Sequence, residues 1–295
     1  MRGSGTAGEP LRAVARGILG DARAAIEDRR RPHAVAVHDF RKAMKRWRAL
    51  LRLLEPFLGE NGRAHRLRAR DLARELARPR DAQSALDGLQ DALKHDKEFS
   101  TRSLQAIRGR LEEVRRRAEA AMLNKVMRGR MMAAIRSASR SVDRWAVEKI
   151  GFDEIADNLT KTYRRARRMI PEDWSKATAD ELHELRRRVI EHRYQMELVT
   201  PLWPRLGKPW VEEAQRLRNR LGRYQDLVVL AGLSAPRQLL APWRSRLKKP
   251  IADRQTAHLA AAARLAGRLF AERPKAFRRR LRAIWQARDR HGSGD

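Results

Sequence analysis

The chain has 295 residues, and its 67 Lys and Arg side chains against 36 Asp and Glu leave a formal net charge of +31. Such an excess indicates a polyanionic partner, while a hydrophobic content of 42% supplies a core and excludes a disordered basic tail. The chain has no cysteine, which excludes disulfides, zinc ribbons, thiol catalysis and iron–sulfur ligation.

The N-terminal residues carry Gly, Pro and Arg without the continuous apolar stretch of a signal peptide. A run of eighteen apolar residues, the length that a transmembrane helix needs, is also absent from the sequence. We therefore expect a soluble cytoplasmic protein that does not insert into a membrane.

Apolar residues recur with a helical period along almost the whole chain, and strand-like alternation is missing. This pattern predicts helices over residues 10–30, 35–56, 62–78, 99–121 and 124–148, and then over 152–170, 179–199, 206–223, 236–247, 251–271 and 274–288. Proline and glycine predict the breaks between them, among others at Pro32, Pro56, Pro79, Pro171, Pro209, Pro250 and Pro274. The sequence thus predicts an all-α fold.

The predicted helix 35–56 has two different faces when residues are placed at 100° per position. His38 shares one face with basic residues, which are Arg41, Lys42, Lys45, Arg48 and Arg52. The opposite face is apolar and consists of Phe40, Met44, Trp47, Leu51 and Leu54. A charged helix face is often no more than a solvated surface, but this one carries no carboxylate to neutralise its repelling cations. It is therefore a candidate ladder for phosphates.

The next predicted helix continues the basic surface with a stripe of arginines spaced by four, at Arg66, Arg70, Arg74 and Arg78. A turn follows at residues 76–81 (LARPRD) and ends at Asp81. An aspartate in this place caps the next helix or pairs with an arginine, although direct catalysis is the alternative reading.

Two motifs return at the same spacing of 145 residues. The string at 37–42 (VHDFRK) returns at 182–187 (LHELRR), and the turn at 76–81 returns at 221–226 (LGRYQD), which ends at Asp226. Because the offset is about half of the chain, we infer an internal duplication with halves at 10–148 and 151–288. The join between them is expected near residues 149–151.

In the second copy, His183, Arg186, Arg187 and Arg193 share one face of the predicted helix 179–199, and Leu182, Leu185, Val189, Met196 and Val199 lie opposite. The two copies differ, because Ile190 and Glu191 stand where the first copy has Lys45 and Arg46. The second half should therefore contribute fewer cations, or use Glu197 to orient an arginine. His192 points toward the apolar side and is interpreted as a packed core histidine.

His38 and His183 occupy equivalent positions, each next to an acid and three residues before an arginine. They are candidates for anion contact, with packing or capping as the alternative. A zinc site is rejected, because Arg187 stands where the second histidine of a zinc-protease helix belongs.

Taken together, the histidines, the basic ladders and the repeated turn resemble the CHAD domain, the conserved histidine α-helical domain, over residues 10–288. The resemblance implies two antiparallel four-helix bundles related by a pseudo-twofold axis, with a basic central groove or pore that binds inorganic polyphosphate. It also implies the stand-alone type, since a Glu-x-Glu-x-Lys signature is absent from the sequence, and an association with polyphosphate or storage granules. The candidate polyphosphate-binding residues are His38, Arg41, Lys42, Lys45, Arg46, Arg48, Arg70, Arg74, Arg78, His183, Arg186, Arg187, Arg193 and Arg223.

Two other functions stay open at this point. A nucleic-acid-binding protein would share the charge, but single-strand binders also stack bases on exposed aromatic rings, and aromatic residues make up only 5% of this chain. A phosphate-processing enzyme would need paired carboxylates, a phosphate loop or an activated nucleophile. The sequence presents no such set, so we assign no catalytic residue, metal site or cofactor.

Overall fold

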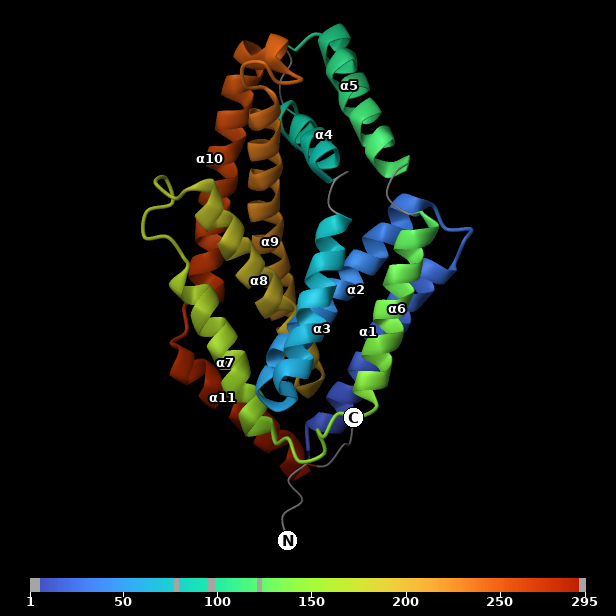
Figure 1. Ribbon diagram of the computed structural model, residues 1–295. Coiled ribbons are helices and arrows are strands. Elements are labelled where there is room, and N and C mark those ends of the chain that lie inside the picture. The colour runs from blue at the N-terminus through green and yellow to red at the C-terminus, as the bar shows by residue number, and fades with distance from the viewer. Residues whose placement is uncertain (1–5, 77–79, 95–98, 121–123, 292–295) are drawn as a thin grey trace.

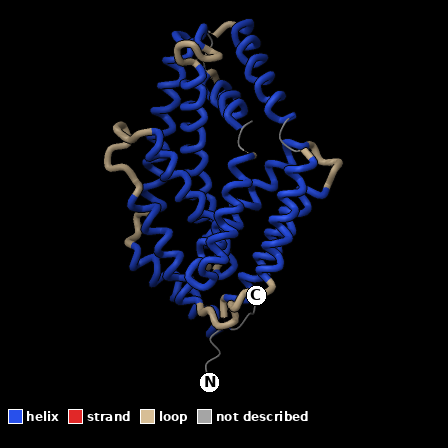
Figure 2. The backbone as a smooth tube through the Cα atoms, viewed as in Figure 1, coloured by secondary structure: helices blue, strands red, loops and turns tan. Residues whose placement is uncertain are grey.

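The structure is a computed structural model that describes residues 6–76, 80–94, 99–120 and 124–291. Every regular element in these ranges is a helix, and none of the described residues lies in a strand (Figures 1 and 2). The predicted all-α class is therefore confirmed. Within the same ranges, every helix is too short or too polar to reach across a lipid bilayer.

The helices follow one another closely along the chain. In order they are α1 (Gly8–Glu27), α2 (His33–Leu53), α3 (Glu55–Glu75), α4 (Arg80–Ala92), α5 (Thr101–Ala120), α6 (Lys125–Val142), α7 (Phe152–Arg168), α8 (Ala179–Val199), the 3₁₀ helix η1 (Thr200–Leu202), α9 (Pro204–Leu233), the 3₁₀ helix η2 (Ala241–Trp243), α10 (Arg244–Leu269) and α11 (Pro274–His291).

The helices predicted from the sequence include none where the structure has α4. This helix is only 13 residues long, but its apolar residues recur with a clear helical period, so the local signal was present and was missed. Ala85 and Leu89 are completely buried on it, in contact with α9 and α10. Because short helices are marginal by themselves, tertiary packing stabilises α4.

Three expectations about the second half are wrong. Pro209 and Pro250 lie inside α9 and α10 instead of ending helices. The helix predicted at 236–247 is mostly turns, with α10 beginning only at Arg244. The turn predicted at 221–226 lies within α9, because Tyr224 stands where the first half has Pro79 and nothing interrupts the helix there. Packing against several neighbours outweighs the local cost of a proline in a long helix.

The two predicted faces of α2 are confirmed. Its apolar face is buried, with exposed fractions of 4% or less for Phe40, Met44, Trp47, Leu51 and Leu54. On α8, Leu182, Leu185, Val189 and Met196 are likewise buried. The core position predicted for His192 is also confirmed, since this side chain is completely buried and accepts a hydrogen bond from the Trp210 indole at 3.1 Å.

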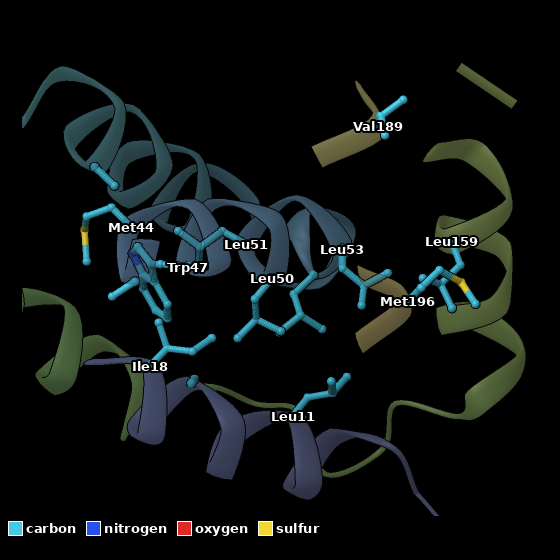
Figure 3. Close-up of a cluster of buried hydrophobic side chains, with 14 of the residues drawn as sticks. Leu11, Ile18, Met44, Trp47, Leu50, Leu51, Leu53, Leu159, Val189 and Met196 are labelled. Carbon is cyan, nitrogen blue, oxygen red and sulfur yellow. The ribbon is translucent and has the colours of Figure 1, made fainter. Parts of the chain in front are cut away.

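Two clusters of buried hydrophobic residues hold the helices together. The larger cluster combines residues from both predicted halves, and Figure 3 shows side chains of α1, α2, α7 and α8 in it, including Trp47, Leu53, Leu159 and Met196. The smaller cluster joins α4 and α5 to α9 and α10, at the top of the view in Figure 1. Each cluster therefore connects segments that lie far apart in the sequence.

The helices of the two predicted halves follow the same order. α1 and α2 resemble α7 and α8 in length and position, and α9 spans the range that α3 and α4 cover together when the numbering is shifted by 145 residues. The expected join at 149–151 lies between α6 and α7. The duplication itself, and the division into residues 10–148 and 151–288, remain predictions.

Candidate anion-binding site

A cavity is lined by residues of α2, α4, α8 and α9, helices that approach one another in the middle of the view in Figure 1. It has a volume of about 910 Å³, and we call it the large cavity. Its lining consists of His33, Ala34, Val37, His38, Arg41, Lys42, Lys45, Leu76, Gln83, Ser84, Asp87, Arg186, Arg193, Tyr194, Gln215, Arg218, Asn219, Gly222, Arg223 and Asp226.

A second cavity of about 340 Å³ lies between α2, α3 and α8, and we call it the small cavity. It is lined mainly by arginines, and its residues are Arg41, Lys45, Arg48, Ala49, Arg52, Arg66, Arg70, Ala73, Arg74, His183, Glu184, Arg186, Arg187, Arg188, Ile190 and Glu191.

Three basic residues belong to both linings, namely Arg41, Lys45 and Arg186. They come from the facing sides of α2 and α8, so the two cavities adjoin along these helices. Arg41 is held in place by a hydrogen bond of 3.2 Å that its guanidinium donates to the carbonyl of Leu76, at the end of α3. The basic faces of α2 and α8 thus meet around one basic region that both cavities share.

Most of the candidate residues line one of the cavities. In addition to the three shared residues, the large cavity contains His38, Lys42, Arg193 and Arg223, and the small cavity contains Arg48, Arg70, Arg74, His183 and Arg187. Arg46 lies outside both linings and instead donates a hydrogen bond of 2.8 Å to Asp21 of α1. The helical turn directs Arg46 toward α1, and a part of this residue in binding stays a prediction. Arg78 lies outside the described residues.

Sequence reasoning left out several lining residues. Arg52 and Arg66 belong to the predicted basic stripes but were not among the candidates, while Arg188 and Arg218 had no assigned place. Gln83 and Asp87 lie on α4, which is not among the predicted helices. Helical spacing could have located Arg218, since it stands four residues before Gly222 and so shares its face of α9.

Arg186 is the most deeply placed cation of the site, with an exposed fraction of 8%. Its guanidinium lies directly over Gly222 of α9, where an added Cβ would be 3.2 Å from Nη2. The missing side chain at Gly222 therefore makes room for the arginine between α8 and α9. The Arg186 guanidinium therefore lies between the two cavities and lines both of them.

Cations crowd one another in the small cavity. Burial, followed by the positive charge of Arg187, lowers the pKa of Arg48. Burial and the neighbouring Arg52 likewise lower the pKa of Arg66. Both side chains remain charged, because an arginine titrates far above neutral pH. Both Arg48 and Arg66 are thus partly desolvated and repelled by neighbouring arginines. An anion that entered this cavity would offset the repulsion between the arginines.

Carboxylates of α8 neutralise part of the second half's charge. Glu184 forms ion pairs with Arg187 at 2.6 Å and with Arg188 at 2.7 Å. Arg193 donates to Glu197 at 2.6 Å and lies over the ring of its neighbour Tyr194. The expectation that Glu197 orients an arginine is therefore confirmed.

The two repeated histidines occupy different cavities. His38 is exposed on the lining of the large cavity, and His183 is half-buried on the lining of the small one. Among the described residues, no group of three His, Asp or Glu side chains is arranged to hold a metal ion, at these histidines or elsewhere.

The comparison with known protein families decides which family this fold represents. The model of the CHAD domain matches residues 13–235. The chain belongs to the CHAD domain family. The matched range includes every residue that lines the large and small cavities, so both cavities lie within the CHAD domain.

Two solved structures share the CHAD fold with this chain. PptA from Streptomyces chartreusis is 18% identical with a TM-score of 0.70, and the match covers 91% of this chain and 100% of PptA. The CHAD domain from the plant Ricinus communis is 18% identical with a TM-score of 0.58, over 98% of this chain and 94% of the plant domain. No curated protein sequence matches the chain.

Proposed function

We propose that this CHAD domain binds inorganic polyphosphate in the two adjoining cavities and does not transform it. The observation that supports this most directly is the convergence of Lys and Arg side chains from α2, α3, α8 and α9 on one region, where they outnumber the lining carboxylates several-fold. Such a concave set of cations fits a linear polyanion, which carries negative charges at regular intervals.

Polyphosphate matches the arrangement in its chemistry. The polymer carries a charge on every phosphate and has no bases to be read, so recognition needs only repeated cations at a suitable spacing. Each arginine fork can bind two phosphate oxygens, whereas a lysine acts as a point charge. The resemblance of the sequence to polyphosphate-binding CHAD domains points to the same ligand.

The aromatic residues favour polyphosphate over single-stranded nucleic acid. Tyr194 is the one Phe, Tyr or Trp ring among the described lining residues, and it lies beneath Arg193 with an exposed fraction of 8%. Trp47 and Trp145 stack on each other in the core, and the exposed Trp203 is not part of either lining. The cavities therefore offer little surface on which bases could stack.

The carboxylates of the small cavity support binding without catalysis. Glu184 and Glu191 both lie within ion-pair distance of arginines, Glu191 at 3.4 Å from Arg188 and 3.8 Å from Arg52. Held in this way, they orient cations and are poorly placed to activate water or a metal ion.

Competition between two polyanions tests the proposal. Fluorescently labelled polyphosphate bound to the protein should be displaced by unlabelled polyphosphate at a lower charge concentration than by single-stranded DNA or RNA. Equal or better displacement by the nucleic acid would favour the nucleic-acid alternative. Release of inorganic phosphate during incubation with Mg²⁺ would contradict the non-catalytic part.

A further inference from the structure

The large and small cavities differ in the density of their charge. The small cavity places most of the arginines of α2, α3 and α8 around about 340 Å³. Each lining contains two carboxylates, but the large cavity is nearly three times as big, has fewer cations and adds the uncharged polar residues Gln83, Gln215 and Asn219.

The crowding in the small cavity has an energetic consequence. Arg48 and Arg66 carry their charges in a partly desolvated place next to other arginines, which lowers the pKa of both. An anion that enters this cavity removes repulsion between the arginines in addition to forming its own contacts. In the large cavity, Lys42 and Arg223 are exposed to solvent, so contacts to them are screened by water and salt.

The three residues that line both cavities form a wall between them, which we call the shared wall. This wall decides whether one ligand can occupy both cavities. Arg41, Lys45 and Arg186 line both of them, so a ligand in one cavity contacts side chains that also face the other. A flexible linear polyanion can continue past this wall, whereas a short one cannot fill both cavities at once.

We propose that the cavities are two unequal subsites for one phosphate chain, in which the small cavity anchors a short run of phosphates and the large cavity holds the continuation. This inference rests on the proposed function and adds which part of the phosphate chain occupies each cavity. Once the anchor is bound, the rest of the chain reaches the large cavity at a high effective concentration. Longer chains then gain affinity by occupying the second subsite.

Ligand length combined with paired variants tests this division. The probes are tripolyphosphate and a polyphosphate of several tens of units, measured by isothermal titration calorimetry. One variant removes two cations that line only the small cavity, Arg48→Gln with Arg74→Gln. Its counterpart removes two that line only the large cavity, Lys42→Gln with Arg223→Gln. A matched control, Arg46→Gln with Arg130→Gln, removes two cations outside both linings, which are ion-paired to Asp21 and Glu75.

The small-cavity variant should lose roughly tenfold in affinity for tripolyphosphate, the equivalent of about 1.4 kcal/mol, while the large-cavity variant loses less than about twofold. The long chain should be weakened in both variants, and the control should bind both probes nearly as the unmodified protein does. Because Arg48 is half-buried, the single substitutions Arg70→Gln, at a partly exposed position of the small cavity, and Lys42→Gln, at an exposed position of the large cavity, repeat the comparison with less risk to folding.

Equal losses of tripolyphosphate affinity in the two variants would overturn the division into subsites, and so would a greater loss in the large-cavity variant. Equal affinity of the unmodified protein for both probes, per mole of ligand, would do the same. Failure of the unmodified protein to bind the long chain would contradict the proposed function itself, which separates the two failures.

Discussion

At the scale of single residues, the candidate site depends on a few neighbours that hold the arginine side chains in place. Arg186 reaches its buried position because Gly222 has no side chain, and Arg193 is held by Glu197 and by the Tyr194 ring. These contacts fix long side chains before a ligand arrives, which reduces the conformational entropy that binding must overcome.

Replacing Gly222 by alanine should separate binding from stability. The new methyl group would lie 3.2 Å from the Arg186 guanidinium and displace it, so polyphosphate affinity should fall roughly fivefold, or about 1 kcal/mol. The melting temperature should change little, because alanine is the better helix former by about 1 kcal/mol. Gly232→Ala in the same helix is the control, since its Cβ would meet nothing within 4 Å. Unchanged affinity in Gly222→Ala would contradict the inference that Gly222 positions Arg186 for the ligand.

His192 should make the fold sensitive to acid. Burial, followed by the charge of Arg280, lowers the pKa of His192 to about 3, whereas in the unfolded chain it titrates near its ordinary value of about 6.5. Between these values the unfolded state binds the extra proton, so stability falls as the pH falls, by up to about 1.4 kcal/mol per pH unit, and above pH ~6.5 the effect vanishes.

Urea unfolding of the unmodified protein and of His192→Gln between pH 7 and pH 4 measures this effect. Glutamine can still accept the hydrogen bond from Trp210 but does not titrate. The free energy of unfolding should therefore depend less steeply on pH in the variant. Parallel curves would mean that His192 does not contribute to the acid sensitivity.

At the scale of elements, α4 and α8 show how helices of different parts of the chain are joined. α4 lies so close to α9 that a Cβ on Gly88 would be 2.7 Å from the carbonyl oxygen of Asp226. About one turn further along α4, Asp91 lies 2.5 Å from the buried His258 and 2.7 Å from Arg254 of α10. The position of α4 at the large cavity thus depends on tertiary contacts of its C-terminal part with both α9 and α10.

Gly88→Ala should therefore push α4 away from α9 and lower the free energy of unfolding by roughly 1–3 kcal/mol. The control is Gly109→Ala on α5, where a Cβ meets nothing within 4 Å and the better helix propensity should leave stability equal or slightly higher. Chemical unfolding followed by circular dichroism measures both. A Gly88→Ala protein as stable as the unmodified one would contradict the close packing of α4.

On α8, Glu184 partly neutralises Arg187 and Arg188 through ion pairs with both. Glu184→Gln removes this carboxylate while keeping its shape, so the two arginines become available to phosphate. The affinity for polyphosphate should rise about threefold, or about 0.65 kcal/mol, which lies within the ~1 kcal/mol that such partly exposed pairs are worth at most. Asp173→Asn, in the loop before α8 and away from both linings, is the control for the change in net charge. A loss of affinity in Glu184→Gln would mean that Glu184 positions the arginines for the ligand.

At the scale of the whole molecule, the net charge of +31 should dominate the thermodynamics of binding. Polyphosphate binding releases counterions, and with about six phosphate contacts the slope of log K against log salt concentration should be near −4, by analogy with single-stranded nucleic acids. A titration at several salt concentrations measures the slope. A value shallower than about −1.5 would contradict a multivalent cationic site.

The sequence alone determined the helical class, the two faces of α2 and α8, and most of the basic residues of the site. These features follow from a local period, because residues three or four positions apart must share a helix face wherever the helix lies. The core position of His192 and the pairing of Glu197 with an arginine follow from the same periodicity.

Only the tertiary structure decided how these faces are arranged. The position of α4 against α9 and α10 depends on partners distant in the chain, as does the direction of Arg46 toward Asp21. The same holds for the passage of α9 and α10 through Pro209 and Pro250. The division of the basic region into a large and a small cavity likewise depends on how α2, α8 and α9 pack. Local propensity amounts to at most about 1 kcal/mol per residue for residues other than proline, and burial between helices outweighs it.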